Sequence, residues 1–165
     1  GAYYERRVDV GPSPSVQRVC FAAERGYVLR TEGPVDAKAA PCSDFSYVEP
    51  EPLEELLMNL PWDVLSSGDW PPASAASGTR GTFTAEGRSV PVLVEENTEN
   101  VEGTQLVFSQ TYAADPWAPG FAGLPYEARF QPLASSTERV AAGGKREPQG
   151  GTQIVKWGSW LGGQK

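Results

Sequence analysis

The chain has 165 residues, enough for one domain with a sizeable core and too few for two comfortable ones. Its net charge of −7 argues against a nucleic-acid partner, because phosphate binding needs a basic face. Eighteen glycines and fifteen prolines lie between short apolar runs without a fixed period, which favours an all-β domain with many turns. No apolar run is long enough for a membrane-spanning helix.

The first predicted elements are two strands, over 16–22 and 27–32, separated by a turn at Glu24-Arg25-Gly26. A helix is predicted over 49–60, because its start is acidic, its leucines recur at helical spacing and Pro61 follows. The Pro-, Ala- and Ser-rich stretch 71–78 is expected to be a loop.

The strongest strand signal is a hairpin over 80–96. Glu86 and Gly87 form the expected turn, and the three valines of the return strand, at 90, 92 and 94, alternate toward one face. Pro91 cannot donate a hydrogen bond to a neighbouring strand, so the return strand is expected at a sheet edge or at a bulge.

Four more strands are predicted over 104–112, 126–133, 137–142 and 152–161. Together the predicted elements form a single domain over 1–165. We expect a small antiparallel β-barrel or sandwich with one short helix and long Gly/Pro-rich loops.

The two cysteines, Cys20 and Cys42, lie 22 positions apart and flank a predicted strand. A disulfide between them would close this loop and add about 3 kcal/mol of stability. The alternative is two buried free thiols. A zinc site is a poor interpretation, because the chain has no histidine.

Motifs for catalysis or for a cofactor are not found in the sequence, and we predict a protein that is not an enzyme. Histidine is missing, and neither a GxSxG motif nor a P-loop occurs. Two acidic clusters remain as sites for calcium or for glycoside hydrolysis, but solvated surface is the favoured interpretation. They contain Glu49, Glu51, Glu54 and Glu55, and Glu95, Glu96, Glu99 and Glu102.

The five tryptophans, Trp62, Trp70, Trp117, Trp157 and Trp160, have three interpretations: core residues, interface anchors or the lining of a ligand pocket. In a regular last strand, Trp157 and Trp160 fall on opposite faces, so that one packs inward and the other meets a partner. A free-standing small-ligand binder with a calycin-like barrel is therefore an alternative function.

The segment 111–134, TYAADPWAPGFAGLPYEARFQPLA, combines stiff prolines, glycines and aromatic residues. It resembles a segment of the manganese-stabilising extrinsic protein of photosystem II (PsbO, the oxygen-evolving enhancer), which has Asp-Pro, spaced glycines and a Tyr followed by an acid. The stretch 87–94, the run from 37 to 52 and the last predicted strand are also similar to that family. The matching cysteine spacing is a further similarity.

This resemblance implies a divergent, shortened, non-enzymatic extrinsic subunit with a β-barrel, a disulfide and no cofactor. Its partners would be core subunits of photosystem II, or of another photosynthetic membrane complex, reached from the thylakoid lumen of the chloroplast. Segment 111–134 would be the docking loop. Its partner-docking residues would be Tyr112, Asp115, Pro116, Trp117, Gly120, Phe121, Gly123, Tyr126 and Glu127.

Overall fold

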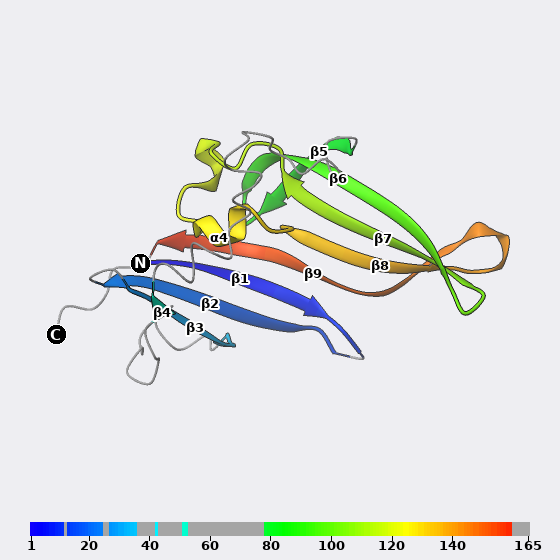
Figure 1. The fold of residues 1–165 in the computed structure, drawn as a ribbon, viewed down its shortest axis with the longest axis horizontal. Helices are drawn as coiled ribbons and strands as arrows, with labels where there is room; N and C mark the ends of the chain where they lie inside the picture. The colour runs from blue at the N-terminus through cyan, green and yellow to red at the C-terminus, as the bar shows by residue number, and fades with distance from the viewer. Residues whose placement is uncertain (12, 25–26, 36–41, 43–50, 53–77, 160–165) are drawn as a thin grey trace.

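The computed structural model describes residues 1–11, 13–24, 27–35, 42, 51–52 and 78–159. Their strands form one antiparallel sheet in the order β4-β3-β2-β1-β9-β8-β7-β6-β5 (Figure 1). The strands are β1 (Ala2–Asp9), β2 (Ser15–Glu24), β3 (Tyr27–Pro34), β4 (Glu51–Pro52), β5 (Thr79–Ala85), β6 (Arg88–Val101), β7 (Thr104–Ala113), β8 (Ala134–Val140) and β9 (Arg146–Ser159). The described part of the chain is therefore all-β, as predicted, and its sheet is open rather than closed.

The helical segments of the described part are short: η1 (Pro119–Phe121), α4 (Tyr126–Arg129) and η2 (Ala142–Gly144). Figure 1 shows η1 and α4 at one end of the twisted sheet, with the β6–β7 and β8–β9 hairpins reaching to the other end. Within the described residues, no helix is long and apolar enough to cross a bilayer.

The predicted hairpin is present, with Glu86 and Gly87 between β5 and β6 at φ angles of 46° and 77°. Such a two-residue turn with positive φ at both positions matches the twist of antiparallel strands. Glu102 and Gly103 repeat this geometry between β6 and β7, with φ angles of 50° and 79°. The Glu-Gly pairs thus set the register of three consecutive strands.

Pro91 does not lie on an edge strand, because β6 pairs with both β5 and β7. Its carbonyl oxygen accepts a hydrogen bond of 3.0 Å from the Ala114 N–H, just past the end of β7 at Ala113. The missing N–H therefore falls where the β6–β7 ladder ends, which explains why an inner strand tolerates the proline.

Two other predictions differ from the structure. Residues 126–133 are not a strand: α4 begins after Pro125, whose carbonyl oxygen accepts the Arg129 N–H at 3.3 Å. Proline at the start of a helix is favourable, because its φ angle already suits the first turn. In the predicted helix 49–60, Glu51–Pro52 instead form β4 beside Tyr27 and Val28, and the other ten residues lie outside the described part. Residues 71–77 of the predicted loop also lie outside it.

The hydrophobic core gathers side chains from both halves of the sheet and from the segment between β7 and β8. Trp157 of β9 is almost fully buried, and its ring lies 6.2 Å from that of Phe121 at an interplanar angle of 28°. Tyr4 of β1, which pairs with Trp157, is also buried. Of the two tryptophans predicted on opposite faces of the last strand, Trp157 packs into the core. Trp160 lies outside the described part.

A second cluster holds Tyr3 together with the Cys20–Cys42 disulfide, which confirms the predicted pairing. Beside it, Glu5 and Arg18 form a largely buried ion pair, with Arg18 Nη2 at 2.6 Å and Nε at 3.0 Å from Glu5 Oε1. Two guanidinium donors on one carboxylate satisfy charges that would be costly to bury alone. The Arg18 guanidinium also lies over the Tyr3 ring, 5.8 Å from its centre.

Removal of the disulfide is expected to destabilise the protein. The paired change Cys20→Ala and Cys42→Ala should lower the free energy of unfolding by about 3 kcal/mol, because the unfolded chain regains the freedom of a 22-residue loop. Urea unfolding of the variant and of the wild type measures this difference. A reducing agent should bring the wild type to the variant's stability and leave the variant unchanged. Equal stability of the two proteins without reductant would contradict the prediction.

Candidate functional site

The candidate site is the loop 114–133, which connects β7 to β8 and contains most of the predicted docking residues. Its beginning is held by an Asx turn: Asp115 Oδ1 accepts the Trp117 N–H at 2.9 Å, and the Asp115 carbonyl oxygen accepts the Ala118 N–H at 3.1 Å. Its end is held by Leu133, whose N–H donates to the Thr111 carbonyl and whose carbonyl accepts the Ile154 N–H, at 2.7 and 2.8 Å. The loop is therefore tied into the sheet at both ends.

Most apolar side chains of the loop belong to the core rather than to the surface. Phe121 has no exposed surface, and Pro116, Leu124 and Leu133 are each at most 2% exposed. The prediction that Phe121 and Pro116 meet a partner is therefore wrong, because both are already covered within the chain. They act instead as a packing layer for the core around Trp157.

The two predicted docking glycines have packing roles. A Cβ on Gly120 would lie 2.5 Å from Val90 Cγ1, so a larger residue would push the loop off β6. Gly123 has a φ angle of +83°, and a Cβ there would lie 3.1 Å from the backbone of Gly158. Both glycines thus let the loop backbone approach the sheet closely.

Two arginines fasten the loop, Arg129 from within it and Arg88 from β6. Arg129 donates from Nε to the Leu124 carbonyl at 2.9 Å and from Nη1 to the Pro116 carbonyl at 3.4 Å. Arg88, at the start of β6, donates to the Ala122 carbonyl at 3.1 Å, and its guanidinium lies 5.6 Å from the centre of the Trp157 ring. These contacts satisfy loop carbonyls that have no partner in a strand, and they make the loop a rigid part of the domain.

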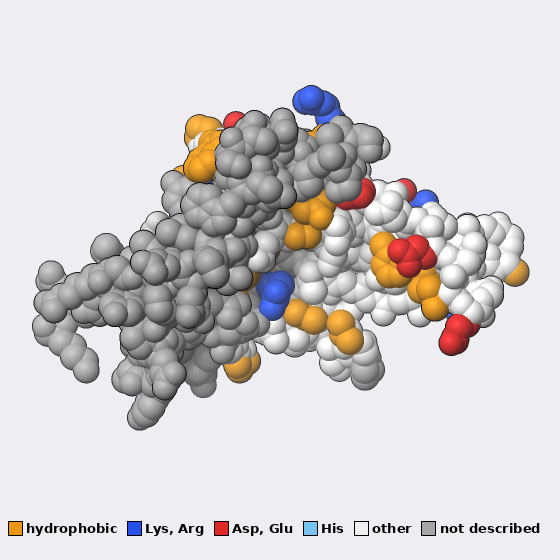
Figure 2. Space-filling view, in the orientation of Figure 1, with side chains coloured by type: hydrophobic (Ala, Val, Ile, Leu, Met, Phe, Trp, Pro, Cys, Tyr) orange, Lys and Arg blue, Asp and Glu red, His pale blue; other side chains and the backbone are white. Residues whose placement is uncertain are grey.

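Trp117 is the exception within the loop, because 60% of its surface is exposed. Its ring meets the edge of Phe130, with the ring centres 5.6 Å apart and an interplanar angle of 70°. On the face drawn in Figure 2, hydrophobic side chains form small patches, one of them where Figure 1 draws the region of η1. Trp117 is thus a large aromatic side chain that the loop holds in contact with solvent.

The other predicted docking residues divide between surface and sheet. Asp115 is exposed, and its side chain caps the turn before Trp117. Tyr112 is half-buried on β7 and donates its hydroxyl hydrogen to Gln110 Oε1; burial, followed by the nearby Glu95 charge, raises the pKa of this hydroxyl. Tyr126 and Glu127 begin α4, and their side chains lie outside the described part.

The second acidic cluster is divided among ordinary surface contacts. Glu96 accepts hydrogen bonds from Arg146 Nη1 at 2.8 Å and from Ser109 at 3.2 Å. Arg146 is also within 3.4 Å of Glu138. Among the described residues, no group of three or more acidic, cysteine or histidine side chains could hold a metal ion. In the first cluster, Glu49, Glu54 and Glu55 lie outside the described part.

Comparison with known proteins gives one family. The sequence model of one protein family, described as a family of unknown function (DUF6068), matches residues 1–165. Neither the curated proteins nor the solved structures yielded a match.

Phe121 and Trp117 are expected to differ in their effect on folding. Phe121→Ala should lower the free energy of unfolding by about 3–5 kcal/mol, because it leaves a cavity against Trp157. Trp117→Ala should cost no more than about 1 kcal/mol, since 60% of the Trp117 surface is exposed and its ring meets Phe130 at an edge. Urea unfolding followed by circular dichroism measures both. Equal losses for the two variants would show that Trp117 also supports the core.

The pKa of the Glu96 carboxyl is expected to depend on Arg146. The hydrogen bond from Arg146 lowers this pKa below its ordinary value of 4.5, so the favourable interaction exists above that pH and is lost as the pH falls through the lowered pKa. In Arg146→Gln, the pKa should rise toward 4.5, as measured by NMR titration of the carboxyl carbon. Arg139→Gln is the matched control, because Arg139 pairs with Glu147 instead. An unchanged Glu96 pKa in Arg146→Gln would contradict the assignment.

Proposed function

The chain belongs to the family of unknown function DUF6068, and we propose that it is a non-enzymatic accessory subunit that docks on a larger protein complex through Trp117. The observation that carries the proposal is the contrast within one loop. Phe121, Leu124 and Leu133 are buried, whereas Trp117 is 60% exposed.

The area of Trp117 and the rigidity of its loop both favour binding through this residue. A buried aromatic side chain covers roughly 150–250 Å², and tryptophan is enriched among the residues that dominate binding energy at interfaces. The loop around Trp117 is held by the Asx turn at Asp115 and by Arg129. Little conformational freedom would therefore be lost on binding, and this lowers the cost of association.

We propose photosystem II as the complex, with core subunits at its lumenal face as partners and the chloroplast thylakoid lumen as the location. Support comes from the resemblance of segment 111–134 to the manganese-stabilising extrinsic protein and from the disulfide, which suits an oxidising compartment. Gly120 and Gly123, which match that family, serve packing in this chain, so these two positions support a similar loop shape. Direct contact is assigned to Trp117 and to the exposed Asp115.

The docking proposal predicts a selective loss of assembly in Trp117→Ala. Co-purification of the tagged chain with its complex from mildly solubilised membranes should fall by at least tenfold, because a central tryptophan at an interface contributes about 2 kcal/mol or more. Mass spectrometry of the retained proteins identifies the partners. Photosystem II core subunits are the expected result, and subunits of another photosynthetic complex would move the assignment to that complex.

Two controls separate docking from folding. Val101→Ala changes another exposed apolar residue, 45% exposed at the β6–β7 turn, and should leave assembly unchanged. The circular dichroism spectrum and urea midpoint of Trp117→Ala should stay close to the wild type. Full retention of Trp117→Ala in the complex, or a wild-type chain that purifies alone, would refute the docking role.

A further inference from the structure

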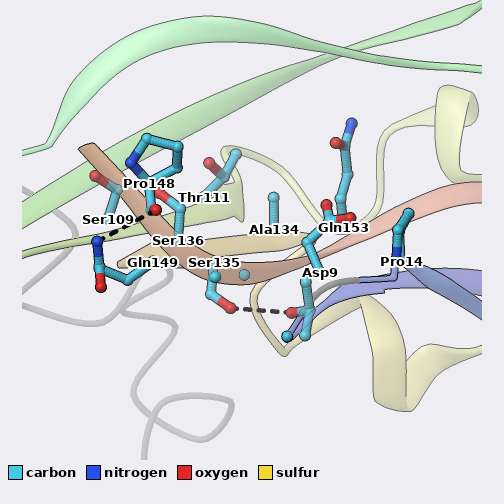
Figure 3. Close-up of a pocket in the computed structure, with 14 residues that line it drawn as sticks. Asp9, Pro14, Ser109, Thr111, Ala134, Ser135, Ser136, Pro148, Gln149 and Gln153 are labelled. Carbon is cyan, nitrogen blue, oxygen red and sulfur yellow. Dashed lines mark hydrogen bonds between the residues drawn. The ribbon is translucent and has the colours of Figure 1, made fainter. Parts of the chain in front are cut away.

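The surface has a hollow of about 570 Å³ that contains no residue of the loop 114–133 (Figure 3). It lies over β7, β8 and β9 and reaches the end of β1 and the following turn. This volume falls within the range of about 300–1,000 Å³ that is usual for small-molecule sites. Tryptophan is not among the residues that line it, so it is not the aromatic cavity of a calycin-like barrel.

The hollow exists because small residues occupy the middle of two rows across the sheet. One row is Thr111, Ala134 and Gln153, and the next is Ser109, Ser136, Gly151 and Asp9. Partners directly opposite in a sheet share a face, and residues two apart on one strand share it as well. Ala134 and Gly151 therefore leave a depression between longer neighbours.

The close approach of three strands requires glycine at 150 and 151. A Cβ on Gly151 would lie 2.3 Å from the Ser135 carbonyl oxygen, and one on Gly150 would lie 2.8 Å from the Asp9 carbonyl oxygen. Neither position accepts a side chain without moving a neighbouring strand. The shape of the hollow is thus built into the backbone packing of β1, β9 and β8.

Polar side chains surround this depression, and several have hydrogen-bonding capacity to spare. Within the described residues, the side chains of Thr111, Ser136 and Gln153 make no hydrogen bond. Figure 3 shows Thr111, Ala134 and Gln153 on the same side of the strands. Ser135 differs, because its hydroxyl bonds to that of Thr152 at 2.9 Å.

The charges at the rim balance one another. Asp9 is the acidic residue of the lining, and its Oδ1 accepts a hydrogen bond of 2.8 Å from Arg7 Nε. Lysine and arginine are not among the lining residues. The row of Gln153 continues to Arg7, whose guanidinium is engaged by Asp9, so an anionic ligand would have to compete with that carboxylate. One carboxylate is too few for calcium.

We propose that this hollow binds a neutral polyhydroxylated molecule, most simply a single sugar ring. A hollow rich in hydroxyl and amide groups is hydrated when empty, and a ligand gains affinity only if it replaces the hydrogen bonds of the displaced water. Sugar hydroxyls both donate and accept, as the side chains of Thr111, Ser136 and Gln153 require. The Ala134 methyl group offers an apolar contact for the C–H groups of the ring.

The test is an NMR titration of the full chain with D-glucose, D-galactose and D-mannose as separate probes. At least one sugar should shift the amide signals of Thr111, Ala134 and Gln153 in a saturable way, with a Kd in the millimolar range. Sodium phosphate and calcium chloride are run in parallel and should not shift these signals. Absence of saturable shifts with all three sugars would overturn the proposal, and so would saturation by phosphate or calcium at the same amides.

Variants locate the site. Gln153→Ala removes an exposed amide and should weaken binding about tenfold, the effect of losing hydrogen bonds to the ligand. Gln131→Ala, an exposed glutamine outside the hollow, should bind like the wild type. Ala134→Leu should abolish binding by filling the depression. Undiminished binding in Gln153→Ala would overturn the assignment even if Ala134→Leu failed to fold.

The sugar site and the docking role use different residues and different measurements. Loss of complex assembly in Trp117→Ala with unchanged sugar shifts would support both. If the chain binds sugar but forms no complex, the sugar site is supported and only the docking role is refuted.

Discussion

The pairing of the first and last strands holds the described sheet together. β1 joins β9 along residues 2–9, and this ladder is the link between the order β4-β3-β2-β1 and the order β9-β8-β7-β6-β5. A register shift between Glu5 and Arg6 leaves an extra residue on β9 between Ile154 and Lys156. Such a bulge changes which side chains share a face. It explains why Ile154 and Trp157, three residues apart, both enter the core.

This arrangement makes the core depend on distant parts of the chain. Tyr4 lies opposite Trp157, Trp157 stacks on Phe121, and Phe121 belongs to a loop that returns from β7. Contacts between such distant residues are slow to form, because the chain must close long loops first. The stability of the loop 114–133 and of the β1–β9 pairing is therefore shared rather than separate.

Short-range patterns predicted much of the fold. The hairpin at Glu86-Gly87 and the strands around Val19 and Val107 follow from alternation and turn residues. β1 was missed because the charged run Glu5-Arg6-Arg7 hides its alternation, and only the pairing of Glu5 with Arg18 makes a carboxylate acceptable in a buried strand. Local sequence does not contain that partner.

The candidate site was less predictable, because a Pro-, Gly- and aromatic-rich segment suits both a docking surface and a packing layer. Which aromatic faces inward depends on tertiary neighbours: Val90 beside Gly120, and Trp157 beside Phe121. The sugar-sized hollow has no sequence motif at all, since its rows bring together three strands and the end of a fourth.

Leu133 connects these two features of the surface. Its backbone bridges Thr111 and Ile154, so the end of the loop 114–133 occupies the place that β8 takes from Ala134 onward. The same hydrogen bonds therefore fix the position of the loop and the row Thr111–Ala134–Gln153 that forms the hollow. A shared rigid frame does not by itself couple two sites, because coupling needs two states that each ligand favours differently. A ligand in the hollow and a partner at Trp117 should accordingly bind independently for as long as Leu133 keeps both hydrogen bonds.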